Sequence, residues 1–151
     1  MIVRLKACGW LMLAVCLLTG CRRAPPLVAA EGRVLLDGKP LPRCSIMLVP
    51  TFTGYGSDLF AVATSDDEGR FRLKCGVGDG ACVGTYKVVI SEAPAPADVG
   101  QYTPDSEAMQ RKYYASLANR PIPDTFGNLA QTPVELEIQP GTTEYEIALE
   151  R

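Results

Sequence analysis

The chain of 151 residues contains no histidine, and this absence removes several kinds of catalytic and metal site. A Ser-His-Asp or Cys-His catalytic unit and a histidine-ligated zinc all require an imidazole. Aromatic residues make up only 7% of the chain, and the single tryptophan is Trp10, close to the N-terminus. No aromatic platform for sugars and no pair of carboxylates for glycoside hydrolysis stands out. We therefore expect no catalytic residues, no metal and no cofactor.

A membrane-spanning apolar run is also missing. The most apolar stretch, residues 7–18, is shorter than the about 20 residues that a transmembrane helix needs. It follows Arg4 and Lys6 and precedes the small residues Thr19 and Gly20, which is the order found in an export signal. We expect residues 1–20 to be removed on export.

Basic clusters are scarce as well. Removing residues 1–20 from 151 leaves 131 residues, the size of one domain. The 15 basic residues then fall to 13 while all 17 acidic residues remain, so the mature net charge is −4. No basic cluster remains beyond the pair Arg22-Arg23 beside the cleavage point. We expect no nucleic-acid partner.

The residues Leu18-Thr19-Gly20-Cys21 resemble a bacterial lipobox. The resemblance implies that a dedicated peptidase cuts before Cys21 and that this cysteine receives three acyl chains. Two or more chains hold a protein stably at a membrane, so we expect a lipid-anchored protein that does not span the bilayer. Arg22 stands where an aspartate would favour inner-membrane retention in many Gram-negative bacteria, which implies the outer membrane. The alternative is an ordinary secretory signal with an incidental cysteine.

Export to an oxidising compartment favours disulfide formation among the remaining cysteines, Cys44, Cys75 and Cys82. Cys75 and Cys82 flank the Gly-rich sequence GVGDGA, which can fold back and bring their Cα atoms within bonding range. We predict a Cys75–Cys82 disulfide. Cys44 lies inside the apolar run CSIMLVP and is expected to be a buried thiol that packs as a small hydrophobe.

After a tether over residues 21–29, short alternating segments separated by turn residues fill an expected domain at residues 30–151. Alternation places Cys44, Ile46 and Leu48 on one face of their segment, and the dipeptide Asp37-Gly38 favours a hairpin. Seven such segments predict an all-β sandwich. They are AEGRVLL (30–36), CSIMLVP (44–50), DLFAVATS (58–65), RFRLKC (70–75), TYKVVIS (85–91), TPVELEI (132–138) and TEYEIALE (143–150).

Residues 93–131 interrupt this pattern and predict one short helix over about residues 104–118. Thr103 can cap it, with Pro104 at its first position. Three side chains recur every four residues and would share one face: Met109, Tyr113 and Leu117. We expect this face to dock as a lid over the open end of the sandwich, leaving Lys112 and Tyr114 exposed. Tyr114 is the candidate binding residue if the helix instead meets a partner.

The body of the chain resembles transthyretin-like and carboxypeptidase-regulatory-like β-sandwich domains. The resemblance covers about residues 30–151 and rests on the segments VLLDGKPLPRCSIMLVP, TSDDEGRFRL and GTYKVVI. The ending IPDTFGNLAQTPVELEIQPGTTEYEIAL is similar to the tail of small lipoproteins of this class in planctomycete-type bacteria. There, Phe126 replaces the usual tyrosine and Val134 the usual leucine. The resemblance implies a seven-stranded antiparallel Greek-key sandwich ending in a hairpin, and it implies no reaction.

The sequence lacks the residues that the known activities of such folds require. The missing histidine excludes the iron site of intradiol dioxygenases and the site of hydroxyisourate hydrolases. An isopeptide bond of the pilin type needs Asn or Asp near the last strand, but TEYEIALE has neither and Asn128 lies in an expected loop. The contiguous acids Asp66, Asp67 and Glu68 lack the spacing of a calcium loop and predict a solvated turn.

These observations predict a membrane-anchored, exported lipoprotein that is a non-catalytic structural or binding module of the cell envelope. Its expected partners are the lipid membrane, through acylated Cys21, and an envelope protein or glycan. The alternative is a carbohydrate- or peptide-binding accessory domain of an envelope enzyme.

Overall fold

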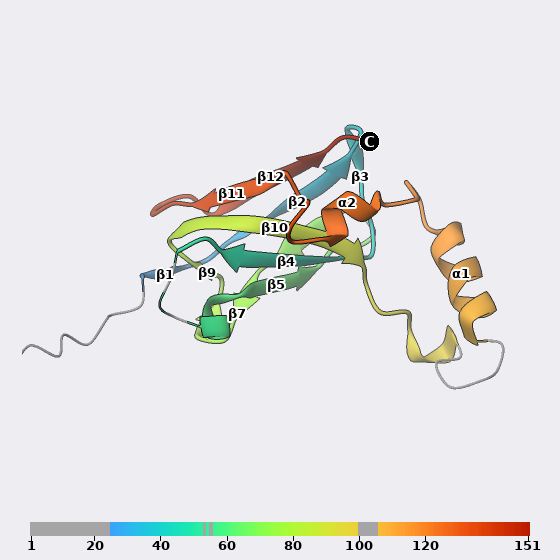
Figure 1. The fold of residues 1–151 in the computed structure, drawn as a ribbon, viewed down its shortest axis with the longest axis horizontal. Helices are drawn as coiled ribbons and strands as arrows, with labels where there is room; N and C mark the ends of the chain where they lie inside the picture. The colour runs from blue at the N-terminus through green and yellow to red at the C-terminus, as the bar shows by residue number, and fades with distance from the viewer. Residues whose placement is uncertain (1–24, 53, 55, 100–105) are drawn as a thin grey trace, which may run out of the picture.

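The computed structural model describes residues 25–52, 54, 56–99 and 106–151, which form mainly strands and few helices (Figure 1). The larger sheet contains, in spatial order, β11 (Glu135–Ile138), β10 (Gly84–Glu92), β4 (Cys44–Pro50), β5 (Ala61–Thr64), β7 (Lys74–Cys75) and β8 (Gly78–Asp79). The smaller sheet contains β12 (Glu144–Leu149), β2 (Glu31–Leu36) and β3 (Lys39–Pro40), and β6 (Arg70–Arg72) also pairs with β2. β1 (Leu27–Val28) pairs with β9 (Ala81–Cys82).

Both sheets contribute apolar side chains to a single core. On β4, the alternating residues Cys44, Ile46 and Leu48 are fully buried, as the sequence predicts. On β2, Val34 and Leu36 are buried and belong to the same cluster. The architecture is therefore consistent with the expected all-β sandwich.

The turn at Asp37-Gly38 forms the expected hairpin. Both residues have positive φ, 52° and 72°, which suits the tightest turns between antiparallel strands. Leu36 of β2 is thereby paired with Lys39 of β3.

The segment RFRLKC alternates as predicted, with Phe71 and Leu73 buried and the basic residues between them exposed. It is not one continuous strand, however. β6 pairs with β2 of the smaller sheet, whereas β7 pairs with β5 of the larger sheet. The switch occurs at Leu73, whose N–H donates to the carbonyl of Ala30 at 2.9 Å.

The last two strands do not form the expected hairpin. β11 pairs with β10 in the larger sheet, whereas β12 pairs with β2 in the smaller one. The chain therefore crosses from one sheet to the other, and Ile138 of β11 and Ile147 of β12 bury their side chains in the core from the two sheets. All the strand pairs found among the described residues are antiparallel except β2–β12, which is parallel.

Three of the four short helices in the described chain lie in the segment between β10 and β11. α1 (Ser106–Ser116) falls within the predicted range, and the expected cap at Thr103 lies outside the described residues. η2 (Ala97–Val99) precedes it, α2 (Asp124–Gly127) follows it, and the other short helix, η1 (Gly56–Leu59), precedes β5. No residue of α1 is buried and Met109 is 42% exposed, so the predicted lid is wrong. No helix in the described part of the chain is long and apolar enough to cross a membrane.

The expected signal at residues 1–20 and the anchor residue Cys21 lie outside the described residues. The expected tether ends sooner than residue 29, because Leu27 and Val28 already form β1. The N–H of Val83 donates to the carbonyl of Pro26 at 2.9 Å and extends this pairing.

Candidate functional site

Helix α1 is the described element that projects furthest from the sandwich (Figure 1). It lies at one end of the long axis of the molecule, and β1 lies towards the other. Tyr114 holds the helix at one point, because its hydroxyl donates to the carbonyl of Ala93 at 3.0 Å. Tyr114 is therefore half-buried, and the prediction that it is exposed is wrong. Its ring also contacts that of Tyr113 edge to face.

Arg120 holds the chain directly after α1. Its side chain is only 7% exposed, and its Nε lies 2.8 Å from a carboxylate oxygen of Glu92 at the end of β10. The same guanidinium donates to the carbonyls of Pro42 at 2.7 Å and Ala118 at 3.2 Å. A planar guanidinium suits such a fixed set of acceptors better than a lysine ammonium would.

Asn119 hydrogen-bonds the segment that follows α1 to the β2–β3 hairpin. Its φ of 59° is left-handed, a conformation that asparagine tolerates after a helix. Its amide donates to the carbonyls of Leu36 at 2.8 Å and Lys39 at 3.1 Å. Neither Asn119 nor Arg120 was predicted from the sequence, although an asparagine soon after a helical pattern is a recognisable stop signal.

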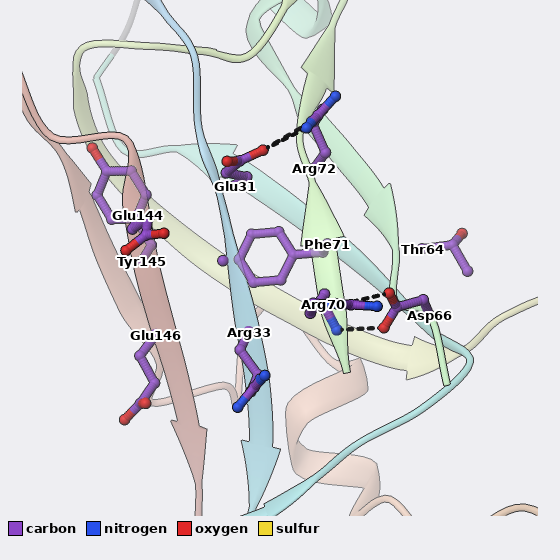
Figure 2. Close-up of a pocket in the computed structure, with 11 residues that line it drawn as sticks. Glu31, Arg33, Thr64, Asp66, Arg70, Phe71, Arg72, Glu144, Tyr145 and Glu146 are labelled. Carbon is purple, nitrogen blue, oxygen red and sulfur yellow. Dashed lines mark hydrogen bonds and ion pairs between the residues drawn. The ribbon is translucent and has the colours of Figure 1, made fainter. Parts of the chain in front are cut away.

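The outer face of the smaller sheet carries a second feature, a groove of about 820 Å³ (Figure 2). Its charged lining residues come from three neighbouring strands and the turn before β6: Glu31, Arg33, Asp66, Arg70, Arg72, Glu144 and Glu146. Figure 2 shows the glutamates of β12 on the opposite side of β2 from the arginines of β6. The groove therefore has an acidic side and a basic side.

Most of the basic side is neutralised within the protein. Arg72 lies 2.8 Å from the carboxylate of Glu31, and Arg70 lies 2.9 Å from that of Asp66. Partial desolvation acts to raise the pKa of Asp66, but hydrogen bonds from Arg70 and Glu68 lower it below its usual value. The groove thus presents charged side chains of both signs, and its arginines on β6 already have partners within the protein.

In the expected solvated turn at residues 66–68, each of the three carboxylates is paired with an arginine. Asp67 pairs with Arg43 at 2.8 Å, and this hydrogen bond lowers the pKa of Asp67. Glu68 pairs with Arg70 at 3.0 Å. Among the described residues, no group of three or more acidic or cysteine side chains is placed to hold a metal ion.

Cys44 is fully buried, as predicted. Its Sγ lies 3.2 Å from Oγ of Ser65, whose hydroxyl donates to the carbonyl of Leu41 at 2.9 Å. Burial raises the pKa of the Cys44 thiol. Ser65 was not recognised from the sequence, because a serine at the end of a strand pattern does not reveal a buried partner.

Cys75 and Cys82 are free thiols in the structure. Cys82 is buried, and Cys75 is half-buried. Burial, followed by the neighbouring Cys75, raises the pKa of Cys82. The loop thus brings the two cysteines together, and the disulfide stays a prediction.

Compared with protein-family models, with curated proteins and with solved structures, the chain matches none of them. The resemblance to transthyretin-like domains therefore rests on the sequence motifs alone.

Proposed function

We propose that the chain is a membrane-anchored, exported lipoprotein that serves as a non-catalytic binding module of the cell envelope. In this proposal Cys21 carries the lipid anchor and α1 contacts a protein of the envelope. The observation that carries the proposal is that α1 buries none of its residues and yet is fastened to the sandwich at its C-terminal side.

The length of α1 supports a role in binding. Isolated helices shorter than about 12–15 residues are marginal in water, and α1 has 11 residues. Neither Met109 of α1 nor Leu117 directly after the helix belongs to the core, because Met109 is exposed and Leu117 is only half-buried. A partner that covers Met109 would supply the burial that the sandwich does not.

The position of α1 favours a protein over the lipid surface. The proposed anchor precedes β1, and α1 lies towards the opposite end of the long axis (Figure 1). An anchored molecule would therefore present α1 away from the bilayer that holds it.

Site-specific photo-crosslinking in intact cells tests this proposal. A photoreactive residue at Met109 should crosslink to a discrete envelope protein. Val62 on β5 is the matched control, because it is 49% exposed on the sheet, close to the 42% of Met109. Equal crosslinking at both positions, or a lipid adduct at Met109, would contradict a protein-binding role for α1.

We also propose that the sandwich follows the seven-stranded Greek-key plan of transthyretin-like domains. The positions of the motifs support this plan, since the DGKPL segment forms the β2–β3 turn and Phe71 and Tyr86 lie in the core. An experimental structure with a different strand order would rule it out.

A further inference from the structure

Strand β12 forms an open edge of the smaller sheet. It pairs with β2 over six consecutive residues, Glu144 to Leu149, and no described strand pairs with its other side. The strand contains no proline, and its register with β2 has no interruption. Such an edge presents unpaired N–H and C=O groups that can accept an added strand.

A groove of about 590 Å³ lies beside this edge, where β12 of the smaller sheet approaches α2 and β11 of the larger sheet. Its apolar lining includes Phe126, Pro133, Val134 and Leu149. Glu135 and Glu150 also line it. β11 is likewise the end strand of its sheet, so the groove follows an open side of the sandwich.

The charged side chains on the two end strands are all acidic, while the inner strands carry Arg33 opposite Glu146 and Lys87 opposite Glu135. Five exposed glutamates lie on β11, on β12 or directly after β12: Glu135, Glu137, Glu144, Glu146 and Glu150. Neither strand contains a lysine or arginine, and none of the five glutamates makes an ion pair within the described chain. This charge disfavours a second copy of the chain, because a symmetric contact through the same edge would bring like charges together.

The pattern of β12 indicates which segment fits. Side chains on an added strand alternate between the two faces of the sheet. One set would lie on the outer face beside Glu144 and Glu146, which Figure 2 shows on β12. The other set would lie on the face of Ile147 and Leu149, towards the apolar groove.

We propose that β12 binds an extended, basic segment of another protein as an added strand, with apolar side chains alternating with lysine or arginine. The backbone of the edge supplies the hydrogen bonds, the groove holds the apolar side chains and the glutamates select for positive charge. This site lies on β12 rather than α1, and it does not depend on the role proposed for α1.

A labelled heptapeptide of alternating lysine and valine is a suitable probe, with the full-length chain in detergent and fluorescence anisotropy as the readout. We expect saturable binding that weakens as salt concentration rises. A twin peptide of alternating glutamate and valine should not bind. A lysine–valine peptide with N-methylated backbone amides keeps the charge but loses the strand donors, and it should bind at least about tenfold more weakly.

Two variants locate the site. Glu146→Lys should weaken binding of the lysine–valine peptide by about tenfold. Glu107→Lys on α1 makes the same charge change on an exposed residue away from β12, and it should alter binding by less than about twofold. Equal loss in the two variants, or equal binding of the N-methylated peptide, would overturn the proposal. Absence of binding by the lysine–valine peptide would also overturn it.

Discussion

At the scale of single residues, Arg120 determines how the segment carrying α1 meets the sandwich. Its guanidinium pairs with Glu92 and donates to backbone carbonyls on both sides of the contact. Removing one partner of a buried ion pair is costly because the other charge and its acceptors lose their partners. The side chain therefore stabilises the fold through its hydrogen bonds as well as its charge.

We expect Arg120→Ala to lower the free energy of unfolding by about 3 kcal/mol, measured by urea denaturation. Arg111→Ala is the matched control, because Arg111 is exposed on α1, and it should change stability by less than about 0.5 kcal/mol. Arg120→Lys should restore only part of the loss, since an ammonium cannot reproduce the planar fork. An Arg120→Ala protein as stable as Arg111→Ala would show that the contact is not structural.

The cysteines give a second test at this scale. If Cys75 and Cys82 are bonded in the exported protein, native protein should expose no reactive thiol. Denatured, unreduced protein should expose one thiol, that of Cys44, because Cys44 is fully buried in the fold. Closing a loop of this length contributes about 2–3 kcal/mol in the chain-entropy model, so Cys75→Ser should cost about that much. Two or three free thiols in the denatured, unreduced protein would show that Cys75 and Cys82 are not bonded.

At the scale of secondary-structure elements, the pairing of β2 with β12 depends on Gly32. A Cβ atom at this position would lie 1.8 Å from the carbonyl oxygen of Tyr145. That oxygen belongs to the backbone of β12, so it cannot move aside without disturbing the strand. The absence of a side chain at Gly32 allows the two strands to approach.

Gly32→Ala should therefore lower the free energy of unfolding by more than about 2 kcal/mol, measured by urea denaturation. Gly127→Ala provides the comparison, because a Cβ there would have its nearest neighbour, the carbonyl oxygen of Ile90, at 3.6 Å. That variant should be neutral or slightly stabilising. A neutral Gly32→Ala would indicate that β12 can shift away from β2 without loss of stability.

The strands show which features of this fold the sequence pattern can predict and which it cannot. Alternation identified the core face of β4, because a half-buried strand requires a period of two. It did not reveal that the chain changes sheet at Leu73, since Phe71, Leu73 and their exposed neighbours alternate without a break. It also did not predict the parallel β2–β12 pair, because the pattern within a strand does not specify its neighbour.

The candidate site was less predictable than the fold. The spacing of Met109, Tyr113 and Leu117 correctly predicted a helix, but periodicity does not show whether an apolar stripe meets the core. The orientation of α1 depends on Tyr114 and Arg120, whose acceptors come from distant segments of the chain. Contacts of this kind follow from the tertiary structure and leave no local pattern.

At the scale of the whole molecule, the proposed lipid anchor at Cys21 would keep the domain at a membrane surface. Mass spectrometry of the mature protein should show that residues 1–20 are absent and that Cys21 is N-terminal and acylated. Cys21→Ala should accumulate as uncleaved precursor. A cleaved, water-soluble Cys21→Ala protein at normal yield would contradict the anchor, and fractionation of the membranes would test the expected outer-membrane location.

Such an anchor gives strand β1 a mechanical consequence. Tension on the anchor would reach the folded body first at residues 26–28, which pair only with the short segment 81–83. The next strand, β2, is paired on both sides, with β12 and with β6, and resists pulling far better. Detaching residues 27–29 would release roughly 10 Å of chain and would remove only the partly buried Val28 from the edge of the core. Under tension, β1 would then detach before the rest of the domain unfolds.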